Sequence, residues 1–293
     1  MQTLILVDIS YYIYNRFWAT HKWYKLNSEE EEFDKDYDWY KDEIFMKHYN
    51  NTFFKNIQNI ATDSISKILW CRDCKNKDIW RHKYIADYKA HRQDNRDKQG
   101  FNCYTIFDYT YDVLLKGYIE SHPNNSIHII QNCEGDDIIA TIAMKYKDKY
   151  NIKIIGNDHD YLQLCNGNNI VLYDINGTKI NGKYGEGEKC LLAKIIRGDK
   201  SDNIPPCKLF RCSDKTILPN IDANITAINK ICDKILLKEG KYISTDDNPT
   251  PPLDFSDLNE IEQRFYINMK IMNFTMIPQY YQTLIINNVK EYV

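Results

Sequence analysis

The chain has 293 residues, of which 43% are hydrophobic, and it carries a net charge of −3 at neutral pH. This length suits one large domain, or one domain with a smaller lobe. No apolar run approaches the roughly 20 residues of a membrane span, and Met1 leads into the first predicted strand without a charged leader. We therefore expect an intracellular protein, acting in a cytoplasm or at a viral replication site, with no membrane partner.

Five short apolar segments, each bounded by polar residues, are typical of buried strands. They span 4–7, 67–71, 127–130, 152–155 and 170–173. Helical patterns alternate with them and predict helices at 44–66, 104–120, 187–197, 221–238 and 255–290. This alternation predicts an α/β fold with a mostly parallel central sheet and flanking helices.

Two polar segments interrupt this alternation. Residues 28–43 are rich in Glu, Asp and aromatics, and we expect an exposed insertion or an irregular helix there. Residues 75–100 are polar and basic, and we expect them to stand away from the core. A linker is predicted at 240–254, where Gly and Pro gather.

Acidic residues follow the predicted strands one after another. Ligands of an open parallel sheet bind at the carboxyl ends of its strands, so acids placed there would converge. Many carboxylates can share one site only if positive charge holds them, and a divalent metal is the usual source. The candidate ligands are Asp8, Asp73, Glu134, Asp136, Asp137, Asp158, Asp160, Asp199 and Asp202.

The spacing of these acids adds detail. Asp158-x-Asp160 has the period of a strand, which places both carboxylates on one side. Asp199-x-x-Asp202 places both on one helical face or in a tight turn. Two hard cations held in this way can activate water and stabilise the leaving oxygen of a phosphodiester. Each acid alone is also explained by an exposed turn or a helix cap, and for Asp174 we prefer the turn.

Between Arg72 and Lys98 the chain is rich in Arg and Lys, with Trp80, Tyr84 and Tyr88 interleaved. Basic groups beside stacking rings suit a single-stranded nucleic acid. Asp78, Asp87, Asp94 and Asp97 lie among these basic residues, so a solvated, charged helix explains the charge equally well.

Nine cysteines, an odd number, are scattered along the chain. The Cys71-x-x-Cys74 pair has zinc-ligand spacing, but no second close pair completes a site, because Cys207 and Cys212 are loosely spaced. We interpret the cysteines as reduced, mostly buried thiols.

Four blocks together resemble the structure-specific 5′ nuclease family, which includes the 5′–3′ exonuclease domain of bacterial DNA polymerase I, flap endonucleases and the bacteriophage RNase H. The first strand ends in Asp8, and Arg72-Asp73 is followed by Trp80-Arg81. The other blocks are Tyr88-Lys89-Ala90-His91-Arg92, Cys133 to Ala140, and Asp158 to Leu164 together with Gly198 to Asn203. Order and spacing agree over residues 1–205.

The resemblance implies a PIN-like catalytic domain over 1–205, with a helical arch at about 75–105, and a C-terminal helical duplex-binding region over 206–293. It implies that one metal is held by Asp8, Asp73, Glu134, Asp136 and Asp158, and a second by Asp160, Asp199 and Asp202, with Asp137 behind them or bound through water. Lys89 and Arg92 would contact the scissile phosphate. Further contacts to nucleic acid would come from Arg81, Lys83, Tyr88 and Arg96.

The implied activity is Mg²⁺-dependent 5′–3′ exonuclease and flap endonuclease cleavage with two ions, for which Mn²⁺ may substitute. The expected substrates are DNA with a 5′ flap or 5′ end and RNA–DNA hybrids such as primers, and a single-strand-binding protein or sliding clamp is a candidate partner. One departure is clear: residues 207–212 contain no glycine where the family has a Gly-x-Gly turn that binds duplex and a monovalent ion. Lys208, Arg211 and Lys215 are phosphate contacts or ordinary surface charge.

Three other readings compete. A haloacid-dehalogenase phosphatase also ends its first strand in Asp, but it needs a second Asp where this chain has Ser10. A PIN-type ribonuclease is much shorter and lacks the Tyr-Lys-x-x-Arg segment. A non-catalytic DNA-binding relative is disfavoured because an acid stands at every metal-binding position of the motif.

Overall fold

The computed structural model describes residues 1–28, 37–61, 66–74, 79–90, 104–165, 167, 169–211, 213–239 and 255–293. Arg92 and Arg96, the predicted linker at 240–254 and most of the predicted arch lie outside these residues. Among the described helices, none is both long and apolar enough to cross a bilayer.

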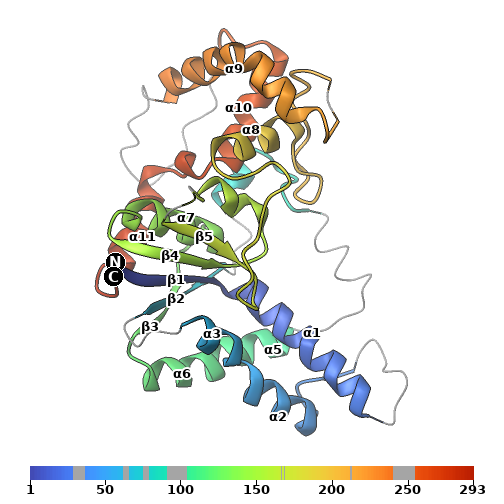
Figure 1. Ribbon diagram of the computed structural model, residues 1–293, viewed down its shortest axis with the longest axis vertical. Helices are drawn as coiled ribbons and strands as arrows, with labels where there is room; N and C mark the ends of the chain where they lie inside the picture. Colours follow the sequence, from blue (N-terminus) through green and yellow to red (C-terminus); the bar gives the residue numbers. More distant parts are fainter. Residues whose placement is uncertain are drawn as a thin grey trace.

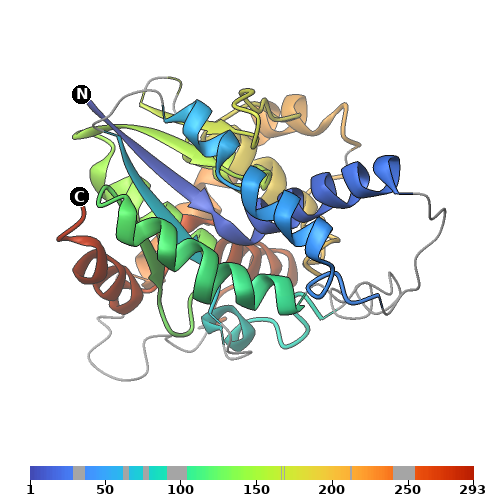
Figure 2. The same cartoon turned by 90° about the horizontal axis from the view of Figure 1, so that it is seen from below.

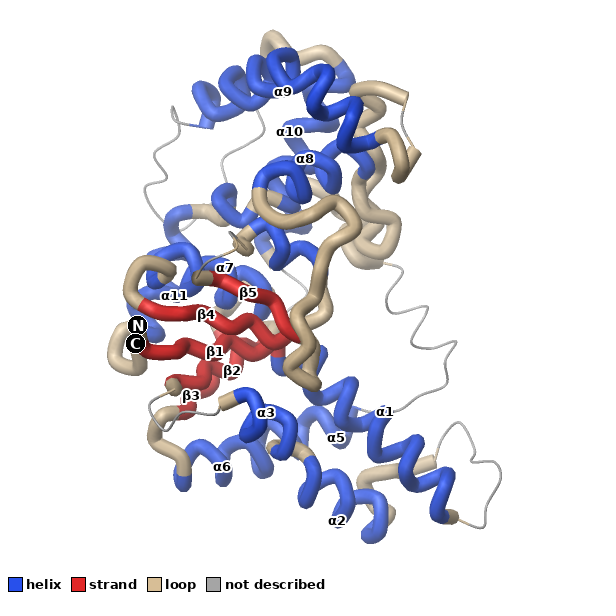
Figure 3. The backbone as a smooth tube through the Cα atoms, in the orientation of Figure 1, coloured by secondary structure: helices blue, strands red, loops and turns tan. Residues whose placement is uncertain are grey.

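A five-stranded sheet forms the centre of the molecule (Figure 3). Its strand order is β3-β2-β1-β4-β5, and every neighbouring pair is parallel. The strands are β1 (Gln2–Asp8), β2 (Lys67–Arg72), β3 (Asn125–Ile129), β4 (Tyr150–Ile155) and β5 (Ile170–Tyr173). All five carboxyl ends therefore point to one edge, as the sequence predicts.

Helices cover both faces of the sheet, because successive side chains of β1 point to opposite sides. Leu4 and Leu6 pack in the core shared with α7 (Gly135–Tyr146) and α11 (Gln279–Val289), whereas Ile5 and Val7 pack in the core on the other face. Figures 1 and 2 show this second layer as the blue and green helices. It contains α1 (Ile9–Asn27), α2 (Glu43–Thr52), α3 (Lys55–Ile60), α5 (Tyr104–Tyr109) and α6 (Lys116–Ser121).

A third core joins the remaining helices above the sheet (Figure 1). It contains α8 (Glu188–Arg197), α9 (Ile217–Glu239) and α10 (Glu260–Met272). Helix α8 thus packs with elements that follow it, while α11 returns to α7 at the sheet. The predicted boundary at residue 205 consequently runs through shared packing.

Several helices differ from the sequence-based expectation. Helix α1 was not predicted, because tyrosines and other aromatics lie around its whole circumference and hide the helical period. The single helix predicted at 44–66 is two helices, α2 and α3, interrupted at Phe53 and Phe54. Within the segment expected to be an exposed insertion, Trp39 is buried, because it packs against Phe17 and Phe45.

The helix predicted at 104–120 contains a π-helical turn, η2 (Thr110–Leu115), between α5 and α6. The Thr110 hydroxyl donates to the Ile106 carbonyl at 2.7 Å and lies 2.9 Å from the hydroxyl of Tyr49. Turns of this kind often occur at functional sites.

Candidate nuclease active site

Carboxylates from four segments meet at the carboxyl edge of the sheet. Asp8 ends β1 and caps α1, Asp73 follows β2, and Asp158 follows β4 and caps the 3₁₀ turn η3 (His159–Gln163). Asp136 lies in the first turn of α7, after β3. Burial, followed by the charges of these four acids, raises the pKa of the Tyr161 hydroxyl well above its usual range. The four acids therefore all lie near the Tyr161 hydroxyl.

Both oxygens of the Asp8 carboxylate accept hydrogen bonds. Its Oδ1 accepts from the Tyr11 amide at 3.1 Å, and its Oδ2 accepts from the Tyr161 hydroxyl at 3.3 Å. Burial, together with the negative charges of Asp73 and Asp158, raises the pKa of Asp8 to about 7. The site thus holds more negative charge than the protein compensates here.

The negative charge of Asp136 is also incompletely compensated by the protein. Its Oδ1 is buried without a hydrogen bond, and its nearest cation is the Arg81 guanidinium at 3.6 Å. Burial and the neighbouring Glu134 and Asp137 raise the pKa of Asp136 well above its usual range.

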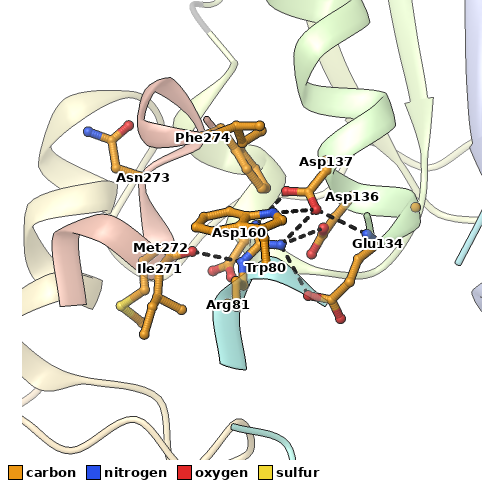
Figure 4. Close-up of polar contacts among 12 residues, drawn as sticks. Trp80, Arg81, Glu134, Asp136, Asp137, Asp160, Ile271, Met272, Asn273 and Phe274 are labelled. Carbon is orange, nitrogen blue, oxygen red and sulfur yellow. Dashed lines mark hydrogen bonds and ion pairs between the residues drawn. The ribbon is translucent and has the colours of Figure 1, made fainter. Parts of the chain in front are cut away.

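Both carboxylate oxygens of Asp137 have partners within the protein (Figure 4). Its Oδ2 accepts from the Trp80 indole at 3.0 Å, from Arg81 Nη1 at 2.9 Å and from the Glu134 amide at 3.0 Å, and Arg81 Nη2 lies 2.8 Å from its Oδ1. Arg81 Nε also donates to the Ile271 carbonyl at 3.1 Å, and only 2% of Arg81 is exposed. This buried knot joins η1 (Trp80–Lys83), the start of α7 and the end of α10.

Glu134 caps α7 and receives donors from η1 and from the segment that follows it. Lys89 Nζ lies 2.6 Å from its Oε1, while the Tyr88 hydroxyl and Arg81 Nη1 each lie 3.1 Å from its Oε2. Although burial opposes ionisation, the charges of Lys89 and Arg81 lower the pKa of Glu134 to about 2. Lys89 adopts a left-handed backbone with φ of 57°, which is costly for a non-glycine residue and often occurs at functional sites.

A second group of acids lies beside the first. Lys194 on α8 forms a close ion pair with Asp160 and lies 4.0 Å from Asp199 Oδ2. Asp199 Oδ1 accepts from the amide and hydroxyl of Ser201 at 2.8 and 2.6 Å. Asp202 is buried, 3.8 Å from Lys89 Nζ. Lys89 therefore bridges the two groups through Glu134 and Asp202.

The donor set fits hard divalent cations, because all nine candidate ligands are carboxylates. Among the residues that the structure describes, Arg81, Lys89 and Lys194 form ion pairs with these carboxylates. Within the described ranges no three acids, histidines or cysteines are already gathered closely enough to hold one ion in this conformation. The raised pKa of Asp8 and the unpartnered oxygen of Asp136 indicate that negative charge remains for an ion to neutralise.

Residues 3–189 match the family model described as the 5′–3′ exonuclease, N-terminal resolvase-like domain. The chain belongs to this 5′–3′ exonuclease family. The match includes seven of the nine acids, and the nuclease assignment agrees with the resemblance carried by the sequence blocks.

Two curated relatives support the assignment. The nuclease is 24% identical over 254 residues to ribonuclease H of Enterobacteria phage T4, covering 83% of this chain and 75% of that protein. It is 25% identical over 210 residues to a 5′–3′ exonuclease of Mycoplasmopsis pulmonis (strain UAB CTIP), covering 69% of this chain and 61% of that protein.

Solved structures share the fold. A phage T5 protein co-crystallised with metal ions superposes with a TM-score of 0.62 at 16% identity, and the match covers 100% of both chains. The phage T5 flap endonuclease in a complex with DNA and metal ions gives the same TM-score and identity over 99% of each chain. These structures confirm the predicted α/β fold of the nuclease.

The basic segment of the nuclease differs from the expectation that it stands away from the core. Trp80, Arg81 and Tyr88 are buried, because their polar atoms bind the start of α7 while their rings and stems fill cores. Arg81 thus faces the acids of the protein, whereas we expected it to contact nucleic acid. Lys83 is exposed on η1, and Arg92 and Arg96 lie outside the described residues.

Other candidate residues of the nuclease have simpler settings. Asp174 Oδ1 accepts from the amides of Asn176 and Thr178 at 2.9 and 2.8 Å, as a turn residue does. Lys208, Arg211 and Lys215 are exposed. The seven cysteines that the structure describes are free thiols.

Sequence reasoning missed three residues of the site: Ser10, Tyr161 and Lys194. Ser10 donates to Asp73, Tyr161 donates to Asp8, and Lys194 pairs with Asp160. Tyr161 adjoins Asp160, and Ser10 follows Asp8 by two residues. Both could therefore have been predicted from their closeness in sequence to the candidate ligands. Lys194 carries no such signal, because a Lys on a helix is ordinarily solvated.

Proposed function

We propose that this protein hydrolyses phosphodiester bonds at 5′ ends and 5′ flaps of nucleic acid, with two Mg²⁺ ions that Mn²⁺ can replace. The observation that carries the proposal is the convergence of carboxylates from separate segments on one sheet edge, with fewer cations than acids among them. Membership of the 5′–3′ exonuclease family supports the reaction class.

The resemblance to the 5′ nuclease family suggests how the acids divide between the two ions. Asp8, Asp73, Glu134, Asp136 and Asp158 would hold one ion, and Asp160, Asp199 and Asp202 would hold the other. Bound ions of this kind activate water and neutralise charge on the leaving oxygen. Asp137 would act behind this group, since its oxygens already bind Trp80, Arg81 and the Glu134 amide.

The cations divide in a similar way. We propose that Lys89, with Arg92, contacts the scissile phosphate, where a positive charge stabilises the charge that builds up in phosphoryl transfer. Lys83 and Arg96 would contact the strand further away. Arg81 and Tyr88 would orient Glu134 and Asp137, because both are buried and both bind Glu134.

Two substrates follow from the relatives. The phage T4 relative is named ribonuclease H, which makes an RNA–DNA hybrid a candidate substrate. The phage T5 structural neighbour is a flap endonuclease crystallised with DNA, which makes a 5′ flap the other candidate. A role in primer removal during replication, with a single-strand-binding protein or sliding clamp as partner, remains a prediction.

The test compares a 5′-labelled DNA flap with a 5′-labelled RNA–DNA hybrid, each with Mg²⁺ and with EDTA. We expect products only with Mg²⁺, and their lengths distinguish junction cutting from stepwise removal. Asp158→Asn and Asp160→Asn should each lower the rate at least about 100-fold, while circular dichroism and DNA binding stay close to the wild type.

Asp174→Asn is the matched control, since Asp174 binds only its own turn. It should cleave at the wild-type rate. Equal cleavage by all three variants, or cleavage that persists in EDTA, would contradict the proposed metal mechanism. Absence of product with either substrate would favour the non-catalytic DNA-binding alternative.

A further inference from the structure

Asp73 is held from both sides by elements other than its own strand. Its Oδ1 accepts from the Gly135 amide at the start of α7 at 2.7 Å, and its Oδ2 accepts from the Ser10 hydroxyl on α1 at 2.7 Å. Two short hydrogen bonds, one to each oxygen, fix the orientation of the carboxylate.

A second hydroxyl lies behind Ser10. The Tyr111 hydroxyl is 3.3 Å from Ser10 Oγ. A serine hydroxyl has one proton, and Ser10 gives it to Asp73, so Tyr111 must donate to Ser10. Burial, reinforced by the charge of Asp73, raises the pKa of Tyr111 well above its usual range, which keeps this donor protonated. The result is a chain of donors from Tyr111 through Ser10 to Asp73.

The ring of Tyr111 is itself fixed in place. The Arg72 guanidinium lies over the ring, 3.6 Å from its centroid. Arg72 directly precedes Asp73 in the chain. One short segment therefore contacts Tyr111 and also contains Asp73, the two ends of this chain of donors. Tyr111 also belongs to the π-helical turn, whose Thr110 is anchored to Ile106 and Tyr49.

We propose that Tyr111 is a positioning residue of the nuclease, which acts through Ser10 to orient the Asp73 carboxylate toward the metal site. The Tyr111 hydroxyl lies against Ser10 and not against a carboxylate of the described acids, so its action passes through the Ser10 hydroxyl. This inference rests on the proposed function, because it assigns the oriented carboxylate to a metal. A purely structural Tyr111 would contribute its ring and leave its hydroxyl without effect.

The experiment measures Mn²⁺ binding by electron paramagnetic resonance and cleavage of a 5′ flap, for the full chain and five variants. Loss of an outer partner of a metal ligand ordinarily costs about 10–100-fold in metal affinity. We expect Ser10→Ala to weaken Mn²⁺ binding within that range, and Tyr111→Phe to weaken it about 3–10-fold because it acts one bond further away. Ser10→Thr, which keeps the hydroxyl, should restore binding.

The double variant Ser10→Ala/Tyr111→Phe tests whether Tyr111 acts through Ser10. If Tyr111 acts only through Ser10, the double variant binds Mn²⁺ no more weakly than Ser10→Ala alone. Tyr109→Phe is the control, because Tyr109 lies on the same helical segment and its ring packs against Tyr40. It should bind and cleave as the wild type does.

Two results would overturn the inference. Unchanged Mn²⁺ affinity in Tyr111→Phe would reduce Tyr111 to a packing role, and fully additive losses in the double variant would remove the path through Ser10. Both leave the proposed nuclease intact if the wild type binds Mn²⁺ and cleaves. A wild type that neither binds Mn²⁺ nor cleaves would overturn the inference and the proposed function together.

Discussion

Asp8 combines burial with like charge, and its raised pKa of about 7 makes the protein sensitive to pH. Its usual pKa of 3.8 applies in the unfolded chain. A raised pKa means that the folded state binds the proton more tightly, so this contribution to stability is fully present below pH 3.8 and is lost as pH rises through about 7. A metal ion requires the ionised form and would offset this loss.

We therefore predict that Mg²⁺ raises the Tm more at pH 8 than at pH 5.5. Thermal unfolding at both pH values, with Mg²⁺ or EDTA, tests this. In Asp174→Asn the pH dependence should be unchanged, since that residue lies in a turn. The same Mg²⁺-induced shift at both pH values would mean that Asp8 does not bind the ion.

Arg81 is the main counter-charge of the buried acids. Removing one partner of a buried ion pair leaves an uncompensated charge and costs about 3–5 kcal/mol. We predict that Arg81→Leu lowers the free energy of unfolding by that amount in urea denaturation. Lys83→Leu, which removes an exposed cation from the same turn, should change it by less than about 0.5 kcal/mol. Equal effects would show that the Arg81 contacts do not stabilise the fold.

At the scale of single residues, the sequence indicated the acids better than the cations. Asp8, Asp73 and Asp158 could be predicted to meet because parallel strands end at a common edge. The burial of Arg81 could not, since nothing in a polar, basic segment distinguishes an arginine that points inward. Contacts made at long sequence separation, such as Arg81 with the Ile271 carbonyl, have no local pattern.

At the scale of elements, the turn after α8 positions the second group of acids. Gly198 has φ of 67° and ends α8, and it precedes the pair of hydrogen bonds that join Asp199 to Ile204. A Cβ at Gly198 would collide with the backbone of Ile204 and Pro205. The turn therefore requires glycine for both conformation and space.

We predict that Gly198→Ala weakens metal-dependent cleavage and stability together. Gly185→Ala is a matched control, because Gly185 has a similar φ of 79° but open space around the added Cβ. The positive φ alone should cost about 1–3 kcal/mol in each variant. Urea denaturation and flap cleavage measure the losses of stability and activity in both variants. A larger loss in Gly198→Ala than in Gly185→Ala would report the collision of the added Cβ with the backbone. Equal losses would show that this collision has no effect.

Elements with a clear period were predictable, and interrupted ones were not. Strands β1, β2 and β4 follow from continuous apolar runs. Helix α1 has aromatics on every side, and the π turn η2 changes the helical period in the middle of a segment. In both cases packing against the sheet, which the local sequence does not contain, decides the structure.

At the scale of the whole molecule, α11 closes one face of the sheet far along the chain from the strands that it covers. Ile285 is fully buried in the core shared with α7, whereas the adjacent Leu284 is 36% exposed. We predict that Ile285→Ala costs about 2–5 kcal/mol of stability, and that Leu284→Ala costs much less. The folded Ile285→Ala protein should cleave at the wild-type rate at low temperature. A loss of cleavage without a loss of stability would assign α11 to the site.

The overall arrangement of the molecule was partly predictable from the sequence. Alternating strands and helices gave the parallel sheet, and the family resemblance gave the position of its site. The sharing of helices across residue 205 could not be predicted, because it depends on how α8 and α11 pack with distant elements.

The parallel sheet has a consequence for attaching labels or tethers to the ends of the chain. Strand β1 starts next to the N-terminus and reaches Asp8 after seven residues, a length of roughly 20 Å. Figures 1 and 2 place the C-terminus on the same side of the sheet as the N-terminus. A fluorophore or surface tether fixed at either end would thus leave the acid-bearing edge facing solution, so single immobilised molecules could be watched while long nucleic acids reach the site unhindered.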